Sequence, residues 1–255
     1  MQVTMSPEPP LNLHGKAAVV TGASGGLGRA IAVALGSAGV RVGLVARSKR
    51  GLEETERLIG DPRTQIWCTD LRDENAIAKL ADSVHADFGS TDFLVNAAGV
   101  WHDEKTKYQG PRLWETPVER IHEVLEVGVL APLLLTRLVL PGMIDRRAGK
   151  ILQISAVFAG LQDGAGWVHY YVANKGMDAF TAALAAELRE FNIQVNCIAP
   201  FFVATEAVQR FYPEEFLPKA LQPRDVADIA MFLLSSAANH ISGQVIAVRN
   251  RHDHD

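Results

Sequence analysis

The feature that most constrains the fold is a buried strand that runs into a glycine-rich turn and then a helix. Residues 16–21 (KAAVVT) form an apolar run rich in β-branched residues, which predicts a strand buried on both faces. Gly22, Gly26 and Gly28 follow, and a helical pattern covers residues 29–38. Glycines let the backbone approach a pyrophosphate closely, and a helix N-terminus offers free N–H groups and the positive end of its dipole. This order predicts a nucleotide site rather than a plain tight turn.

Strands and helices then alternate along the chain. Further strands are expected over residues 41–46, 64–69, 92–95 and 151–154, with helices between them. This alternation implies an α/β fold with a parallel sheet covered on both faces, whose ligand crevice lies at the carboxyl ends of the strands. The polar residues at those ends are Thr21, Asp70, Asn96 and Ser155.

The residue after the second strand bears on the choice of cofactor. An acidic residue there would bind the ribose 2′-hydroxyl, whereas Arg47 accommodates a 2′-phosphate. Ser24, in the glycine turn, adds a hydroxyl for the same phosphate. These two residues favour NADP(H) over NAD(H), and a solvated loop arginine is the alternative.

Composition and charge exclude several classes of partner. A net charge of −4 gives no electrostatic reason to expect nucleic acid or an anionic membrane as partner. Residues 124–143 are very apolar but carry Glu126 and Arg137, so we expect a buried helix rather than a membrane span. Cys68 and Cys197 lack metal-ligand spacing and favour a reducing, cytoplasmic environment. Residues 1–12 show no signal-peptide pattern.

A possible proton-transfer pair follows the strand at 151–154. Tyr171 and Lys175 are four residues apart, so on a helix they share a face. A nearby ammonium lowers the pKa of a phenol and readies it for proton exchange. The spacing alone is weak, because a core tyrosine beside a surface lysine produces it too.

Four motifs together resemble the short-chain dehydrogenase/reductase family: TGASGGLG (21–28), NAAG (96–99), YVANK (171–175) and VNCIAP (195–200). The resemblance covers about residues 13–248. It implies a Rossmann-type, doubly wound parallel sheet of about seven strands, a small-molecule substrate and a nicotinamide cofactor. It also implies a homodimer or homotetramer formed through the helices at 118–138 and 171–191.

The resemblance also implies roles for individual residues. Tyr171 matches the acid/base tyrosine, and Lys175 matches the lysine that binds the nicotinamide ribose and tunes the phenol. Both would therefore contact the cofactor, and no metal is expected. The other implied cofactor-binding residues are Gly22, Ser24, Gly26, Leu27, Gly28, Arg47, Asp70, Leu71, Asn96, Ala97, Gly99, Pro200, Val203 and Thr205.

The sequence departs from the family on the nicotinamide side. Ala156 falls where the family has its catalytic serine, and Ser155 replaces it only if the strand bulges or shifts by one residue. Gly128 takes the place of the asparagine that holds a relay water, and Phe201 that of a glycine after Pro200. Losing one oxyanion donor costs roughly 10²–10³ in rate. These departures suggest altered chemistry.

We expect one domain over residues 13–248, with a flexible segment at 1–12 and a polar tail at 249–255. A lid is expected at about 201–220, and its aromatic residues suggest an apolar or aromatic substrate, with packing of the lid on its own domain as an equal alternative. Those residues are Phe201, Phe202, Phe211, Tyr212 and Phe216.

Three functions remain open. The first is an NADP(H)-dependent oxidoreductase acting on a carbonyl/alcohol pair with Tyr171 as acid/base. The second keeps the fold but uses Tyr171 in a dehydration, isomerisation or cyclisation without net hydride transfer, the cofactor being structural or absent. The third is a catalytically silent subunit that binds a nucleotide or a partner.

Overall fold

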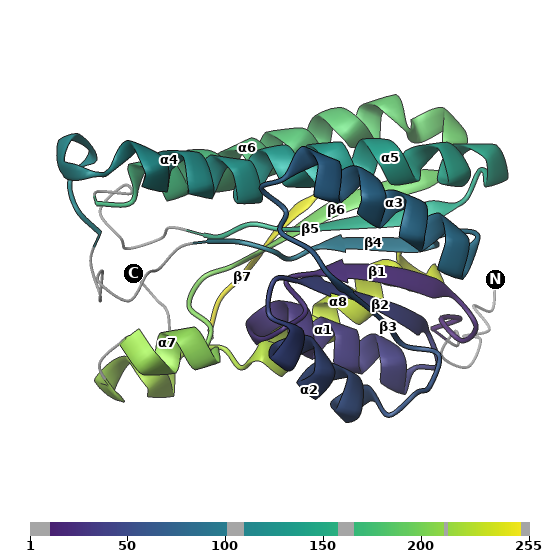
Figure 1. Cartoon of the computed structure of the whole chain (residues 1–255), viewed down its shortest axis with the longest axis horizontal. Helices are drawn as coiled ribbons and strands as arrows, with labels where there is room; N and C mark the ends of the chain where they lie inside the picture. Colours follow the sequence, from purple (N-terminus) through teal and green to yellow (C-terminus); the bar gives the residue numbers. More distant parts are fainter. Residues whose placement is uncertain (1–10, 101–109, 158–165, 212–213, 251–255) are drawn as a thin grey trace, which may run out of the picture.

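A parallel sheet forms the centre of the computed structural model, which describes residues 11–100, 110–157, 166–211 and 214–250 (Figure 1). Within these residues the sheet has seven strands in the order β3-β2-β1-β4-β5-β6-β7, so the predicted Rossmann-type fold is confirmed. The strands are β1 (Ala17–Thr21), β2 (Arg41–Ala46), β3 (Gln65–Cys68), β4 (Phe93–Asn96), β5 (Gly149–Ile154), β6 (Ile193–Pro200) and β7 (Val245–Val248).

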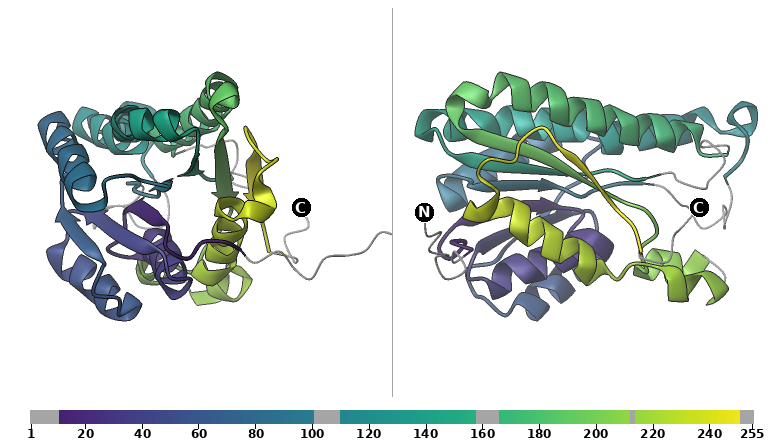
Figure 2. Two further views of the ribbon diagram at one scale, coloured as in Figure 1. Left: turned by 90° about the vertical axis from the view of Figure 1, so that its right-hand side faces the viewer. Right: turned by 180° about the vertical axis from the view of Figure 1, so that it is seen from behind.

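Helices cover both faces of the sheet (Figures 1 and 2). One face carries α3 (Glu74–Phe88), α4 (Val118–Leu125), α5 (Ala131–Arg146) and α6 (Val168–Glu187). The other carries α1 (Gly26–Ser37), α2 (Lys49–Ile59) and α8 (Pro223–Leu234). The short helix α7 (Glu206–Phe211) and the 3₁₀ turn Glu214–Lys219 follow β6.

Alternating side chains along each strand build two cores. On β1, Ala18 and Val20 pack toward α1 and α8, whereas Ala17 and Val19 pack toward the opposite layer. All five residues of β1 are buried, as the continuous apolar run predicts for a strand covered on both faces.

The apolar stretch predicted as one helix is longer and less uniform than expected. α4 and α5 are joined by a π-helical turn, Glu126–Leu130, so the helical segment Val118–Arg146 is continuous. By length and composition alone this segment is long and apolar enough to cross a membrane. α4 contacts α6, and α5 contacts α3. In the most apolar part of Val118–Arg146, 33% is buried, so the expectation of a buried helix is met only in part.

Strand order fixes where a ligand can lie. β1 pairs with β2 on one side and β4 on the other, so the chain reverses its direction of winding there. Ligands of open parallel sheets bind in the crevice beyond the carboxyl ends at this switch point. The glycine turn after β1 and the NAAG turn after β4 both lie there.

Candidate active site

The glycine turn packs backbone to backbone against the turn that follows β4. Gly22 has φ +68°, and a Cβ atom there would lie 2.8 Å from the carbonyl oxygen of Ala97. A Cβ at Gly28 would lie 2.4 Å from the carbonyl oxygen of Gly22. The Thr21 hydroxyl accepts hydrogen bonds from the N–H groups of Ala97 (3.0 Å) and Ala98 (3.1 Å). Side chains are therefore excluded, which leaves the backbone open to a ligand.

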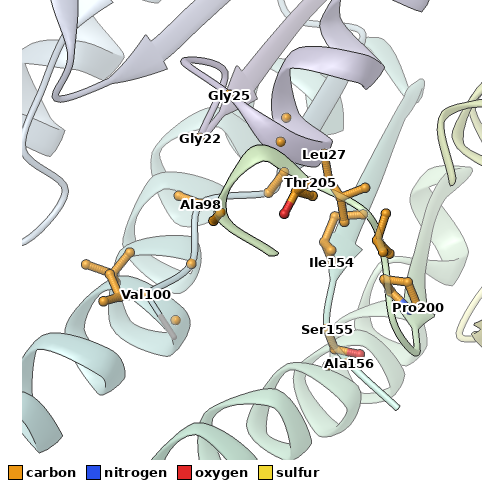
Figure 3. A pocket seen from close by; sticks show the side chains of 18 of the residues that line it. Gly22, Gly25, Leu27, Ala98, Val100, Ile154, Ser155, Ala156, Pro200 and Thr205 are labelled. Carbon is orange, nitrogen blue, oxygen red and sulfur yellow. The ribbon is translucent and has the colours of Figure 1, made fainter. Parts of the chain in front are cut away.

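A cavity of about 1130 Å³ extends from this turn along the carboxyl ends of the strands (Figure 3). The predicted cofactor residues that line it are Gly22, Ser24, Gly26, Leu27, Gly28, Arg47, Asp70, Leu71, Ala97, Gly99, Pro200, Val203 and Thr205. Ser155 and Ala156 line it as well. The predicted site residues outside its lining are Asn96, Tyr171 and Lys175.

Charged side chains gather where an adenosine would lie. Arg72 forms an ion pair with Asp70 (2.6 Å, Nη2 to Oδ2) and lowers the pKa of that carboxyl to about 2. Glu123, on α4, approaches Arg72 (3.9 Å) and Arg47 (3.7 Å). The Arg47 side chain is 55% exposed and so remains accessible to a ligand. The arginine predicted to select the cofactor thus stands at the cavity edge beside a second cation.

An acidic side chain already occupies the N-terminus of α1. The carboxylate of Glu206 accepts a hydrogen bond from the N–H of Gly26 at 2.9 Å and pairs with Arg29 at 3.1 Å. Arg29 also donates to the carbonyl oxygen of Ser24 and pairs with Glu54 at 3.0 Å. The N–H group that the motif offers to a phosphate is therefore able to bind an anion.

Asn96 does not line the cavity and instead connects the sheet to a helix. It is buried (3% exposed), and its amide donates a hydrogen bond to Thr136 on α5 at 3.3 Å. Among the described residues its Oδ1 atom has no hydrogen-bond partner. A polar residue that ends a buried strand can thus serve the packing between sheet and helix.

Tyr171 and Lys175 lie together but on the other side of the segment that follows β5. They line a smaller cavity of about 260 Å³, with Val157, Asp178 and Val245 among its other walls. Lys175 forms an ion pair with Asp178 at 2.8 Å, and this contact raises the pKa of the lysine. Its ammonium lies 5.9 Å from the centre of the Tyr171 ring. The predicted pair is present, and its cavity adjoins the large one, because Ala156 and Val157 line both.

The hydroxyl of Ser155 is held by the same acidic residue. Ser155 is 4% exposed and donates to Asp178 at 2.7 Å, while the Cys197 thiol lies 3.2 Å from its oxygen. Burial raises the pKa of Cys197 to about 11. The backbone after β5 borders the large cavity, but the Ser155 hydroxyl is already bound to a carboxylate on α6.

Tyr170 and Asn174 line the large cavity, whereas Tyr171 and Lys175, which the family resemblance assigns to the chemistry, line the smaller one. The reason is the rotation of α6. Its buried stripe includes Ala173, Met177 and Thr181, at a spacing of four residues. Tyr170 and Asn174, three residues before Ala173 and Met177, lie next to this stripe. Tyr171 and Lys175, one position later, are turned from it by about a further 100°. The stripe was visible in the sequence, and it was the signal that could have identified Tyr170.

The surroundings of Tyr170 keep its phenol protonated. Burial raises its pKa above the ordinary value of 10.0, and a hydrogen bond with the Asn174 side chain opposes this only in part. The Trp167 ring meets it edge-on, with ring centres 6.4 Å apart. A half-buried phenol with no ammonium at the fourth following position is therefore protonated at neutral pH and available as a proton donor. It ionises to a phenolate on its own only at high pH.

The other departures from the family also border this cavity. Gly128, in the π-helical turn, faces α6, where an added Cβ would lie 3.3 Å from the Ala173 Cβ. Phe201 and Phe202 follow β6 and line the cavity. Tyr212 and the side chains of Phe211 and Phe216 lie outside the described residues. Among the described residues, no group of three or more histidine, cysteine or acidic side chains could hold a metal ion.

Comparison with known proteins agrees with this architecture. Residues 16–215 match the family model for short chain dehydrogenases. The 3-oxoacyl-[acyl-carrier-protein] reductase FabG of Aquifex aeolicus is 34% identical over 93% of this chain and 97% of the relative. Nodulation protein G of Rhizobium sp. (strain N33) is 33% identical over 92% of this chain and 96% of the relative.

A solved structure shares the same fold. The 3-ketoacyl-(acyl-carrier-protein) reductase of Brucella melitensis, crystallised in complex with NADH, superposes with a TM-score of 0.85 at 26% identity, covering 95% of this chain and all of the other (100%). The match of the family model over most of the chain, together with this fold, establishes that the protein belongs to the short-chain dehydrogenase family of oxidoreductases.

Proposed function

We propose that this protein is an NADP(H)-dependent oxidoreductase that interconverts a carbonyl and an alcohol. The observation that carries the proposal is the single cavity that runs from the glycine turn to the phenol of Tyr170. The turn fits a dinucleotide because side chains are excluded at Gly22 and Gly28, and because the Gly26 N–H binds an anion. Arg47 and Arg72 at the far end support a 2′-phosphate, and hence NADP(H) over NAD(H).

In this proposal Tyr170 carries the proton. The nicotinamide supplies or accepts the hydride when the cofactor is bound. Because burial raises the pKa of Tyr170, its phenol is protonated at neutral pH and acts as general acid toward a carbonyl oxygen. Asn174, four residues after Tyr170, is uncharged, and its hydrogen bond lowers this pKa only in part. The site therefore favours carbonyl reduction, which needs a proton donor, over alcohol oxidation, which needs a base.

The walls near Tyr170 support an apolar or aromatic substrate. The Trp167 ring meets Tyr170 edge-on, and Phe201 and Phe202 line the same cavity. Aromatic rings supply much of the apolar area that small-molecule sites bury. Polar groups near the reacting atoms are few, because the Ser155 hydroxyl is bound to Asp178.

A second candidate function is proton-transfer chemistry without net redox. It is favoured by two changes in the lining of this cavity, where Ala156 and Gly128 stand in place of a hydroxyl and an amide expected beside a nicotinamide. Lys175, which carries the expected ammonium, lines the neighbouring cavity. Tyr170 would then act as acid in a dehydration, isomerisation or cyclisation, with the cofactor serving structure alone.

One titration separates these functions. Purified protein is titrated with NADPH and with NADH while the nicotinamide fluorescence is followed, and candidate ketones are then supplied. We expect NADPH to bind more tightly than NADH and Arg47→Glu to reverse the preference. Binding of neither nucleotide would contradict the oxidoreductase proposal, and turnover of a substrate without nucleotide would establish the second candidate.

We further propose a cytoplasmic homodimer or homotetramer. The outer face of α4, α5 and α6 exposes apolar side chains, which supports a contact between copies of the chain. They are Val118, Leu130, Leu133, Leu138, Val168 and Val172. Cys68 and Cys197 are both free, which agrees with a reducing compartment.

A further inference from the structure

We propose that Glu206 is a built-in competitor for the cofactor's pyrophosphate and thereby sets the affinity for the dinucleotide. The inference rests on the proposed function, because it concerns the same cavity. It adds a residue outside the predicted site, 180 positions from Gly26 in the sequence. Thr205, the residue before Glu206, lies beside the glycine turn in Figure 3.

The contact is specific to the group that a phosphate would use. Oε2 of Glu206 accepts the Gly26 N–H at 2.9 Å, and its Oε1 lies 3.1 Å from Arg29. Free N–H groups at the start of a helix, together with the helix dipole, attract one anion at this position. A carboxylate and a phosphate oxygen cannot accept the same N–H at once, so the dinucleotide must displace the Glu206 side chain.

Arg29 and the chain segment that leads to Glu206 both make further contacts. The Arg29 side chain is 17% exposed and also donates to Thr55 at 3.1 Å and to the Ser24 carbonyl oxygen. On the other side, Ala204 donates to the carbonyl oxygen of Leu221 at 2.8 Å. The residue before Glu206 is itself close to the turn, since a Cβ on Gly26 would lie 3.5 Å from Thr205. These contacts keep the backbone before Glu206 next to the turn, so a dinucleotide can bind there once the Glu206 side chain moves aside.

The exposure of the carboxylate limits the size of the effect. The Glu206 side chain is 62% exposed, so its attraction to Arg29 is screened by water. A surface ion pair and a helix-dipole contact each contribute modestly, so removal of the competitor should tighten binding by roughly threefold to tenfold. Chloride would screen both contacts, so the difference should shrink as ionic strength rises.

The test compares NADPH binding by the full-length protein and three variants, again by nicotinamide fluorescence. Glu206→Ala removes the acceptor and the charge, and Glu206→Gln removes the charge alone. Glu54→Gln is the matched control, since Glu54 pairs with Arg29 at 3.0 Å but makes no hydrogen bond to Gly26. We expect the dissociation constant to fall about threefold to tenfold in Glu206→Ala, less in Glu206→Gln and least in Glu54→Gln.

A readout without nucleotide separates failure of this inference from failure of the proposed function. Inorganic pyrophosphate should raise the melting temperature of Glu206→Ala more than that of the unaltered protein. If NADPH binds both proteins equally, or binds Glu206→Ala more weakly, the inference is overturned. If neither protein binds a nucleotide, the proposed function fails, and the pyrophosphate measurement alone decides the inference: equal stabilisation of both proteins overturns it.

Discussion

At the scale of single residues, the structure separates two neighbouring tyrosines that the sequence presents together. Tyr170 lines the large cavity, and Tyr171 lines the smaller one with Lys175. The difference of one helical position turns the side chain by about 100°, enough to move it from one cavity to the other. The chemical role of each phenol is therefore open to a direct test.

We predict that Tyr170→Phe lowers the turnover of a ketone by roughly 10²–10⁴, the usual contribution of a positioned general acid. Tyr171→Phe is the matched control, because it removes the same hydroxyl from the next residue. It should leave turnover within about threefold, well below the effect of losing such an acid. Steady-state NADPH oxidation measures both, with melting temperatures as the check on folding. A loss confined to Tyr171→Phe would restore the assignment to Tyr171 and Lys175.

The raised pKa of Tyr170 predicts the pH dependence of reduction. Burial raises this pKa, so the phenol should remain protonated across neutral pH. We therefore expect the reduction rate to hold steady through neutral pH and to decline only above pH 10.0, the ordinary value from which this pKa is raised. A pH profile of kcat in carbonyl reduction measures this. A decline that begins near neutrality would mean that an unidentified cation lowers the pKa of the phenol.

At the scale of elements, α6 connects both cavities and the outer surface. Ala173 and Met177 are buried and line the large cavity, Tyr171 and Lys175 line the smaller cavity, and Val172 is 53% exposed on the outside. With α4 and α5 this outer surface forms an apolar face whose burial would be favourable.

We predict that a charge on this face disrupts assembly. Leu133, on α5, is 40% exposed, and Leu133→Glu would bury an unpaired carboxylate in a contact between copies. Light scattering coupled to size exclusion should show a smaller species for this variant. Leu58→Glu is the control, because Leu58 is 57% exposed on α2, on the opposite layer. A monomeric parent protein, or an unchanged mass in Leu133→Glu, would contradict the proposed interface.

At the scale of the whole molecule, a buried lysine ties the sheet to the helix layer. Lys150, on β5, is 8% exposed and donates to the carbonyl oxygen of Ser235, just beyond the end of α8, at 2.6 Å. Burial lowers its pKa from 10.5 to about 8. Between these two values the unfolded chain binds more protons than the folded chain, so this group's contribution to the unfolding free energy increases with pH.

We predict that the difference in unfolding free energy between the parent protein and Lys150→Met shifts in favour of the parent as the pH rises from 8 to 10. The shift should reach about 1–3 kcal/mol, which is the scale of a pKa change of this size. Urea denaturation at each pH measures it. The raised pKa of Cys197 makes the folded chain keep a proton that the unfolded chain loses, so this group lowers the unfolding free energy as the pH rises. Both proteins contain Cys197, so its contribution cancels in the difference between them. A difference that stays constant with pH would contradict the burial of a charged Lys150.

Much of the fold was predictable from the sequence because its signals are local. The apolar runs, the glycine turn and the amphipathic segments each depend on neighbouring residues, and β2 (Arg41–Ala46) begins and ends where the sequence predicts. The glycine end of the site was predictable for the same reason, since Gly22, Gly26 and Gly28 act through the backbone of one turn.

The chemical end of the site was decided by packing between distant elements. The sequence alone predicts a Rossmann-type sheet, the family and the position of the glycine turn. Only the tertiary structure decides that Tyr170 instead of Tyr171 lines the large cavity, because the rotation of α6 depends on which of its residues, such as Ala173 and Met177, are buried. Only it shows that Glu206, 180 residues from Gly26, binds the N–H of the turn. Side-chain direction and long-range contacts depend on the whole core, whereas strands, turns and helices depend on neighbours.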